Sequence, residues 1–230
     1  MDISFATEHP RLDEIALDIA RQHNRKAYLS VLQKYPELIN DVNSKSFLDI
    51  YRRLNNDILA AKRNFEQIWS KYEADWFSLL RELFPNAESL FPRSSFIAYL
   101  GVGTICPRDL NECSFLLPFD STRMVNIVAH ETSHFYFYYY LLANNVGEKN
   151  KIFSSKRLWL ISEAIVPLIF ETERSNKIIG AQPICSYACT KEQIDQLREQ
   201  FSLVYSNSTD FISILPSLYE TTKNWSHRNV

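Results

Sequence analysis

Residues 120–144 read DSTRMVNIVAHETSHFYFYYYLLAN, and this stretch decides how the chain folds. Asp120, Ser121 or Thr122 is expected to cap a helix that continues to about residue 144. Apolar and aromatic side chains surround this helix on most of its sides, so we expect it to be buried. The rest of the fold should therefore pack around it.

The pentad HETSH at residues 130–134 gives this helix its chemistry. His130 and His134 stand one turn apart on one helix face, so both imidazoles can reach one tetrahedral zinc ion. Glu131 lies beside the first histidine and can act as general base towards a water that zinc acidifies. The alternative is a pair of core histidines, which would leave an ionisable glutamate in an apolar helix at a high energetic cost. The pentad predicts a catalytic zinc site.

A third ligand is predicted in the apolar stretch LWLISEAIVPLIF at residues 158–170. Glu163 is its only acid, and a carboxylate in such surroundings needs a partner, which a metal supplies. The alternative is a core carboxylate paired with a buried Arg or Tyr. No G-x-x-H follows His134, which excludes the metzincin arrangement. The other histidines lie near the two ends of the chain, at His9, His23 and His227.

With these residues the sequence resembles the gluzincins, zinc peptidases with an H-E-x-x-H helix and a glutamate ligand on the next helix. The segment LISEAI is loosely similar to the W-L-N-E-G-F segment of their aminopeptidase branch. The resemblance implies one Zn²⁺ per chain held by His130, His134 and Glu163, with Glu131 as the base. It also implies that residues 113–119 form an edge strand to which an extended peptide adds by backbone hydrogen bonds.

Two departures from the gluzincin pattern affect the surroundings of the metal. The position four residues after the glutamate ligand is Asp in the thermolysin-like branch and Pro167 here. The group supporting a ligand histidine is then Glu171 or a backbone carbonyl. The G-x-M-E-N segment that grips a free amino terminus is absent, which argues against an aminopeptidase.

Stabilising the oxyanion requires a further donor, which the spacing does not identify. Tyr187 is the first candidate for a catalytic role, followed by Tyr205 and His227. Each has a purely structural role as its alternative, because the chain holds 12 tyrosines.

The remaining patterns predict an α+β fold that is predominantly helical, with a zincin-like core. Residues 95–105 and 113–119 are predicted as two antiparallel strands joined by the loop CPRDLNE, so that a small antiparallel sheet precedes the H-E-x-x-H helix. Residues 1–90 are expected to form a helical region packed on a catalytic core of residues 91–230, together one compact unit. Predicted helices span residues 11–34 (one kinked helix or two), 47–83 (about 40 residues), 155–174, 190–204 and 208–222.

Composition narrows the class of protein. A formal charge of -2 over 230 residues gives no basic stripe for nucleic acid, and only 4 glycines favour helices. The amino terminus lacks a secretory signal, and the apolar run at 135–143 is too short for a bilayer, so we expect a cytoplasmic protein without a membrane partner. The cysteines at 106, 113, 185 and 189 are expected as free thiols, with a zinc site made of all four as the alternative.

The sequence therefore predicts a zinc metallopeptidase acting on a peptide or protein substrate. One alternative keeps the metal and changes the substrate to a non-peptide amide or ester. A second alternative is a non-catalytic helical interaction protein whose zinc only joins two helices. Glu131 argues against the second, because a structural zinc site needs no base.

Overall fold

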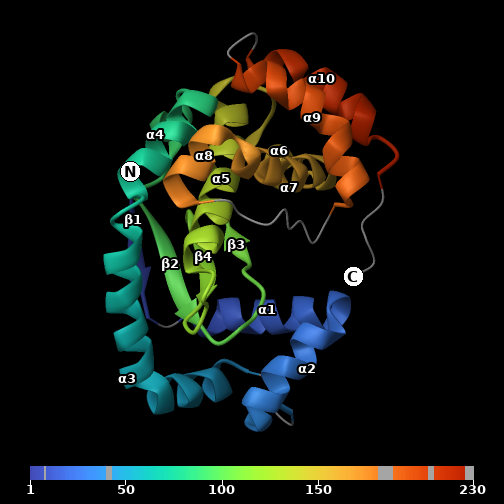
Figure 1. Cartoon of the computed structure of the whole chain (residues 1–230). Helices are drawn as coiled ribbons and strands as arrows, with labels where there is room; N and C mark the ends of the chain where they lie inside the picture. The colour runs from blue at the N-terminus through green and yellow to red at the C-terminus, as the bar shows by residue number, and fades with distance from the viewer. Residues whose placement is uncertain (8, 40–42, 181–188, 207–209, 226–230) are drawn as a thin grey trace. The chain divides into compact units, whose positions relative to one another are not determined.

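A computed structural model describes residues 1–7, 9–39, 43–180, 189–206 and 210–225 (Figure 1). The chain divides into two compact units, each made of two segments. The sheet unit comprises Met1–Glu73 and Pro92–Glu131. The helical unit comprises Ala74–Phe91 and Thr132–Val230. Within the described residues, no helix has both the length and the apolar character needed to cross a bilayer.

The described part of the sheet unit contains a mixed four-stranded sheet in the order β1-β2-β4-β3. Strand β1 pairs parallel with β2, β2 pairs parallel with β4, and the two-residue β3 pairs antiparallel with β4. The strand bounds are Asp2–Ala6 (β1), Ser95–Gly101 (β2), Arg108–Asp109 (β3) and Ser114–Pro118 (β4). The prediction of a mainly helical chain with one small sheet is confirmed.

The predicted antiparallel pairing of residues 95–105 with 113–119 is wrong, because β2 and β4 run parallel, with Ala98 opposite Phe115. The loop between them is long enough for the crossover that parallel neighbours require, and its residues Arg108–Asp109 also form a short hairpin with β4. The prediction that 113–119 is an edge strand is also wrong. Strand β4 lies between β2 and β3 in the sheet, and Leu116 N donates to Pro107 O at 2.9 Å.

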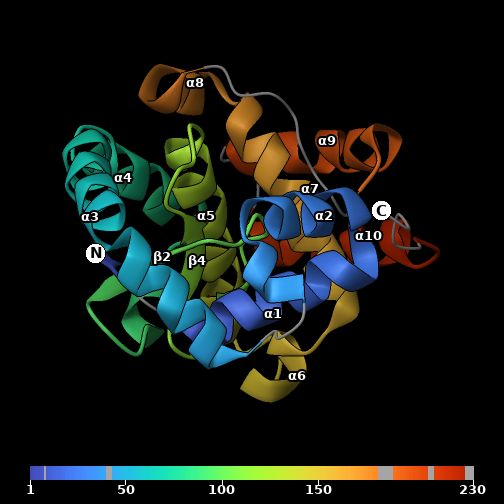
Figure 2. The same cartoon turned by 90° about the horizontal axis from the view of Figure 1, so that it is seen from below.

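Two helices, not one kinked helix, fill residues 10–34: α1 (Pro10–His23) and α2 (Arg25–Lys34). Asn24 separates them, and its side chain caps α2 by accepting a hydrogen bond from Ala27 N at 2.9 Å. The two helices pack on each other, and α1 also packs on β2 and β4 (Figure 2). A short 3₁₀ turn, η1 (Pro36–Ile39), follows α2.

The single helix of about 40 residues predicted for 47–83 is wrong. Helix α3 spans Ser44–Trp69, and a turn at residues 70–72 separates it from α4, Glu73–Leu83. The Glu73 carboxylate accepts hydrogen bonds from Trp69 Nε1 at 3.0 Å and from Ile3 N of β1 at 2.8 Å. Helical periodicity is the same on both sides of the turn, so it cannot reveal a break that these contacts stabilise.

The helical unit is built mainly from the chain after Thr132, together with Ala74–Phe91. Helix α5 (Met124–Ala143) begins in the sheet unit and is buried along nearly all of its length from Val128 to Leu141, as predicted. Helices α7, α9 and α10 pack against one another, with α9 and α10 coloured orange to red in Figure 1. The other bounds are η2 Ala87–Leu90, α6 Lys149–Phe153, α7 Lys156–Glu171, α8 Glu173–Ile179, α9 Lys191–Tyr205 and α10 Phe211–Thr222.

Candidate metal centre

Helix α5 carries both histidines of the pentad one turn apart. His134 is completely buried, Glu131 is buried, and His130 is half-buried. Helix α5 begins at Met124, and the carbonyl of Arg123 accepts a hydrogen bond from Ile127 N of its first turn at 3.1 Å. Ser121, one of the three residues predicted to cap this helix, accepts on Oγ from Arg123 N at 3.1 Å. That hydrogen bond lies in the turn before α5 and does not reach the first turn of the helix, as a cap would.

Helix α7 supplies the carboxylate. Its first turn is capped by Ser155, whose Oγ accepts from Leu158 N at 3.2 Å, and Glu163 lies in its buried middle with 7% of its surface exposed. Glu163 Oε1 lies 3.3 Å from His134 Nε2. The ligand atoms of His130, His134 and Glu163 all lie within 4.8 Å of one another. The three residues predicted as ligands from the sequence are therefore brought together.

The donor set fits zinc. Two imidazole nitrogens and one carboxylate oxygen are ligands that zinc prefers, and three protein ligands leave a fourth position open, as catalytic zinc sites require. With bonds of about 2.1 Å, two ligands of a tetrahedral zinc ion lie about 3.4 Å apart. The 3.3 Å between His134 Nε2 and Glu163 Oε1 matches that separation. Within the described residues this is the group of His, Cys, Asp and Glu side chains that could hold a metal ion.

Glu131 has a partner that the sequence did not point to. Arg108 of β3 donates from Nη1 to Glu131 Oε2 at 2.8 Å, and both side chains are largely buried. In the sequence Arg108 belongs to the loop CPRDLNE, where a charged residue is expected at the surface. No spacing relates residues 108 and 131, so only the pairing of β3 with β4 could have revealed this contact.

Trp76 of α4 supports the two ligand-bearing helices within the helical unit. Its Nε1 donates to Thr132 Oγ1 on α5 at 3.0 Å, and its ring lies edge-on to Phe170 of α7 with 5.8 Å between centroids. Thr132 lies two residues before His134. Trp76 is completely buried, and it contacts α5 and α7, the two helices that carry the predicted ligands.

The residues predicted to support a ligand histidine or to stabilise the oxyanion lie in different surroundings. Glu171 accepts a hydrogen bond from Arg198 Nη2 of α9 at 3.2 Å, so this carboxylate is engaged in an ion pair with α9. Tyr205 is the last residue of α9 and is half-buried. The candidate catalytic residue Tyr187 and the outsider His227 lie outside the described residues. His9 caps α1 through Nδ1, and His23 is exposed at the end of that helix.

The cysteines within the described residues, Cys106, Cys113 and Cys189, are free of disulfides, and none belongs to the metal-binding group. Burial raises the pKa of the Cys106 thiol, and the negative charge of Glu131 raises it further. The four-cysteine site has its remaining member, Cys185, outside the described residues.

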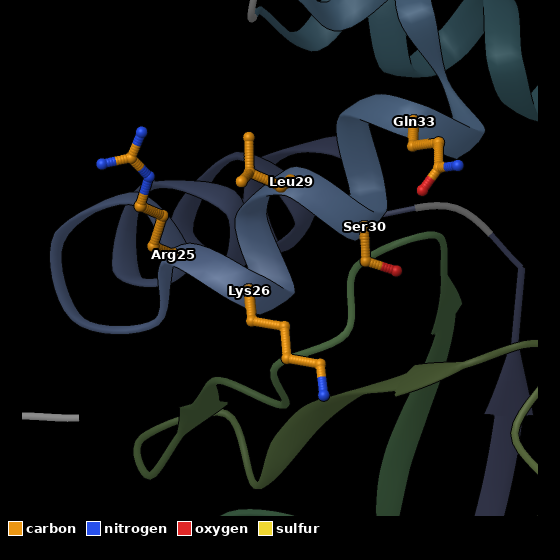
Figure 3. A pocket seen from close by; sticks show the side chains of 5 residues that line it. All are labelled: Arg25, Lys26, Leu29, Ser30 and Gln33. Carbon is orange, nitrogen blue, oxygen red and sulfur yellow. The ribbon is translucent and has the colours of Figure 1, made fainter.

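A depression on the surface of α2 is lined by none of the residues of the candidate metal centre (Figure 3). The side chains that line it all come from this one helix and are exposed: Arg25, Lys26, Leu29, Ser30 and Gln33. Its lining contains no carboxylate, imidazole or thiol, the side chains that bind zinc.

Comparison with known proteins adds no family to these observations. A scan against protein-family models, a search of curated proteins and a search of solved structures each found no match to this chain. The geometry of His130, His134, Glu163 and Glu131 therefore carries the functional argument by itself.

Proposed function

We propose that this chain is a zinc-dependent hydrolase of the gluzincin type, acting as a peptidase. The observation that carries the proposal is the convergence of His130, His134 and Glu163 from two helices, with their ligand atoms within 4.8 Å of one another. Glu131 follows the first of these ligands directly in the chain. A structural zinc site would need no such carboxylate, which favours catalysis over a zinc that only joins two helices.

The roles follow from the side chains. His130, His134 and Glu163 would hold the ion. Zinc, when bound, would supply Lewis acidity that polarises a carbonyl and lowers the pKa of water towards about 7. Glu131 would accept the proton of the attacking water and return it to the leaving group as the carbon–nitrogen bond breaks. The burial of Glu131 and His134 keeps bulk water from competing for these groups.

One observation favours the second candidate, a zinc hydrolase of a non-peptide amide or ester. A peptide that binds as an added strand needs an open sheet edge. Strand β3 covers part of β4, and Pro118 at the end of β4 has no N–H to donate. The edge available for a peptide is therefore shorter than the resemblance implies, while a small amide or ester would need none.

The test combines metal analysis with hydrolysis. Wild-type protein should retain about one zinc per chain after dialysis, and so should Glu131→Gln, because Glu131 is not a ligand. Glu131→Gln should lose hydrolysis by at least about 10²-fold, because an amide cannot accept the proton. Glu148→Gln is the matched control, an exposed acid in a surface pair with Lys151 that should change neither property.

Two substrate panels separate the candidates, a quenched-fluorescence peptide library and a set of small amides and esters. Cleavage of peptides supports the peptidase. Cleavage confined to the small substrates supports the second candidate. Protein that binds no zinc would overturn both, and zinc binding with no hydrolysis of either panel would support the structural role.

A further inference from the structure

The ion pair between Arg108 and Glu131 has no part in the scheme above, although one of its members is the proposed base. The side chains are 13% and 6% exposed, and the donor and acceptor lie 2.8 Å apart. Many other ion pairs in the described residues are surface contacts; Arg52 with Asp49, for example, has both side chains more than half exposed. Surface ion pairs contribute little to the free energy of unfolding. A buried carboxylate that loses its partner, in contrast, strongly destabilises the folded protein.

Arg108 is presented by a well-anchored element. Strand β3 pairs antiparallel with β4, with Arg108 opposite Phe115. The next residue, Asp109, accepts hydrogen bonds on its side chain from Asn111 N at 2.8 Å and from Glu112 N at 3.1 Å. These bonds close the turn after β3. The backbone that carries the guanidinium is therefore held in place by these hydrogen bonds. Arg108 is thus suited to hold the side chain of Glu131 in one orientation.

The general base has a positioning problem that this contact solves. Glu131 has three side-chain torsions, and a displacement of about 1 Å of a catalytic group can cost about 10²-fold in rate. A carboxylate has two oxygens and about four lone-pair sites. Arg108 occupies Oε2, and the other oxygen can accept the proton of a water.

We propose that Arg108 is a positioning residue, which holds Glu131 in the orientation from which it takes the proton of the attacking water. This inference rests on the proposed function. In the step concerned, the water oxygen bonds to the carbonyl carbon, the carbonyl π pair moves to its oxygen, and the water proton passes to Glu131. Arg108 stays protonated throughout and exchanges no proton.

The first part of the experiment needs no substrate and no metal. The melting temperatures of wild type, Arg108→Met, Glu131→Gln and the double variant are measured in EDTA. Arg108→Met should lower the melting temperature by about 5 °C or more, because it leaves Glu131 buried without its partner. The double variant should recover much of that loss, because the charge is removed with its partner. Additive effects would overturn the coupling.

The second part uses zinc-loaded protein and a peptide that the wild type cleaves. Arg108→Met should keep its zinc and lose about 10²-fold in kcat, with KM within threefold of wild type. The kcat of Arg108→Lys should lie between those of wild type and Arg108→Met, because an ammonium is a point charge without the guanidinium fork. Guanidinium chloride at about 50 mM should restore part of the activity of Arg108→Ala and none to Glu131→Gln. Arg52→Met is the matched control on an exposed pair of the same unit.

The outcomes separate the two proposals. If Arg108→Met keeps its zinc and a kcat within threefold of wild type, Arg108 does not position the base, and the proposed function is unaffected. If Arg108→Met fails to fold, the Arg108→Lys variant and the guanidinium rescue of Arg108→Ala decide the question. A wild-type kcat in Arg108→Lys overturns the positioning role. The absence of rescue of Arg108→Ala by guanidinium also overturns it. Wild type that binds no zinc overturns the proposed function, and this inference with it.

Discussion

His134 Nε2 lies 3.3 Å from Glu163 Oε1, with 0% and 9% of the two side chains exposed. This contact joins α5 to α7 inside the helical unit. The separation suits a hydrogen bond and equally suits two ligands of one tetrahedral zinc ion. The two interpretations differ in how the protein responds to metal.

Zinc should stabilise the wild-type protein. Free Zn²⁺ held at about 100 times its dissociation constant should raise the free energy of unfolding by about 2.7 kcal/mol, because the ligand set exists only in the folded state. Thermal unfolding in a zinc buffer measures this. His134→Ala and Glu163→Gln should lose the stabilisation, and His23→Ala, an exposed histidine at the end of α1, should keep it. Equal stabilisation of all four proteins would show that the ion binds elsewhere.

Asp13 should give the sheet unit a distinctive pH dependence. It is completely buried on α1 and accepts hydrogen bonds from Val102 N, Gly103 N and the Tyr51 hydroxyl. Burial raises its pKa from 3.8 to about 6, and the Tyr51 hydrogen bond opposes this rise only in part. The folded state then binds more protons than the unfolded chain between these two values. This group therefore makes the protein less stable as pH rises from about 4 to about 6, by up to about 3 kcal/mol.

Asp13→Asn tests this directly. The amide oxygen can accept from both backbone N–H groups, and the amide nitrogen can donate to the Tyr51 hydroxyl. Urea unfolding of both proteins in EDTA should show the variant gaining stability relative to wild type as pH rises from 4 to 6.5. A stability difference that is the same at every pH would contradict the raised pKa.

Removing the indole N–H of Trp76 should loosen α5. Trp76→Phe keeps most of the buried ring but loses the 3.0 Å hydrogen bond to Thr132. We expect a cost of about 1 kcal/mol in the free energy of unfolding, because Thr132 Oγ1 loses a buried donor. The matched control is Trp225→Phe, whose indole donates to Gln196 at the surface and should cost less than about 0.5 kcal/mol. Equal costs would argue against a supporting role for Trp76.

A side chain at Gly101 should destabilise the protein, because buried neighbouring side chains would have to shift to admit it. A Cβ there would lie 2.4 Å from Leu116 Cδ1 and 2.8 Å from Asp13 Oδ1. Gly101→Ala should therefore cost about 1–3 kcal/mol by overpacking. At Gly147 the nearest atom would be 3.7 Å away, so Gly147→Ala should stay within about 0.5 kcal/mol of wild type. Chemical denaturation of the pair provides the comparison, and equal effects would place the crowding at Gly101 in doubt.

Local features of the site could be read from the residues alone. His130 and His134 belong to one helix, and residues four apart in a helix lie on the same face. Their proximity therefore follows from the local sequence alone. Glu163 was found because a lone acid in an apolar helix needs a partner, and the structure brings it to His134. The cap of α2 is also local, because Asn24 accepts from Ala27 N three residues further on, although the sequence pattern left one kinked helix or two open at this point.

Tertiary structure decided what no short window of sequence contains. The parallel pairing of β2 with β4 depends on which backbone groups meet across a loop, and parallel and antiparallel pairing suit the same apolar residues. The break between α3 and α4 depends on Glu73 reaching back to Ile3 of β1. Arg108 meets Glu131 only because β3 pairs with β4. The sequence by itself thus determined which helix carries the two histidines of the candidate metal centre. The long-range pairings, whose partners are far apart along the chain, decided what surrounds Glu131.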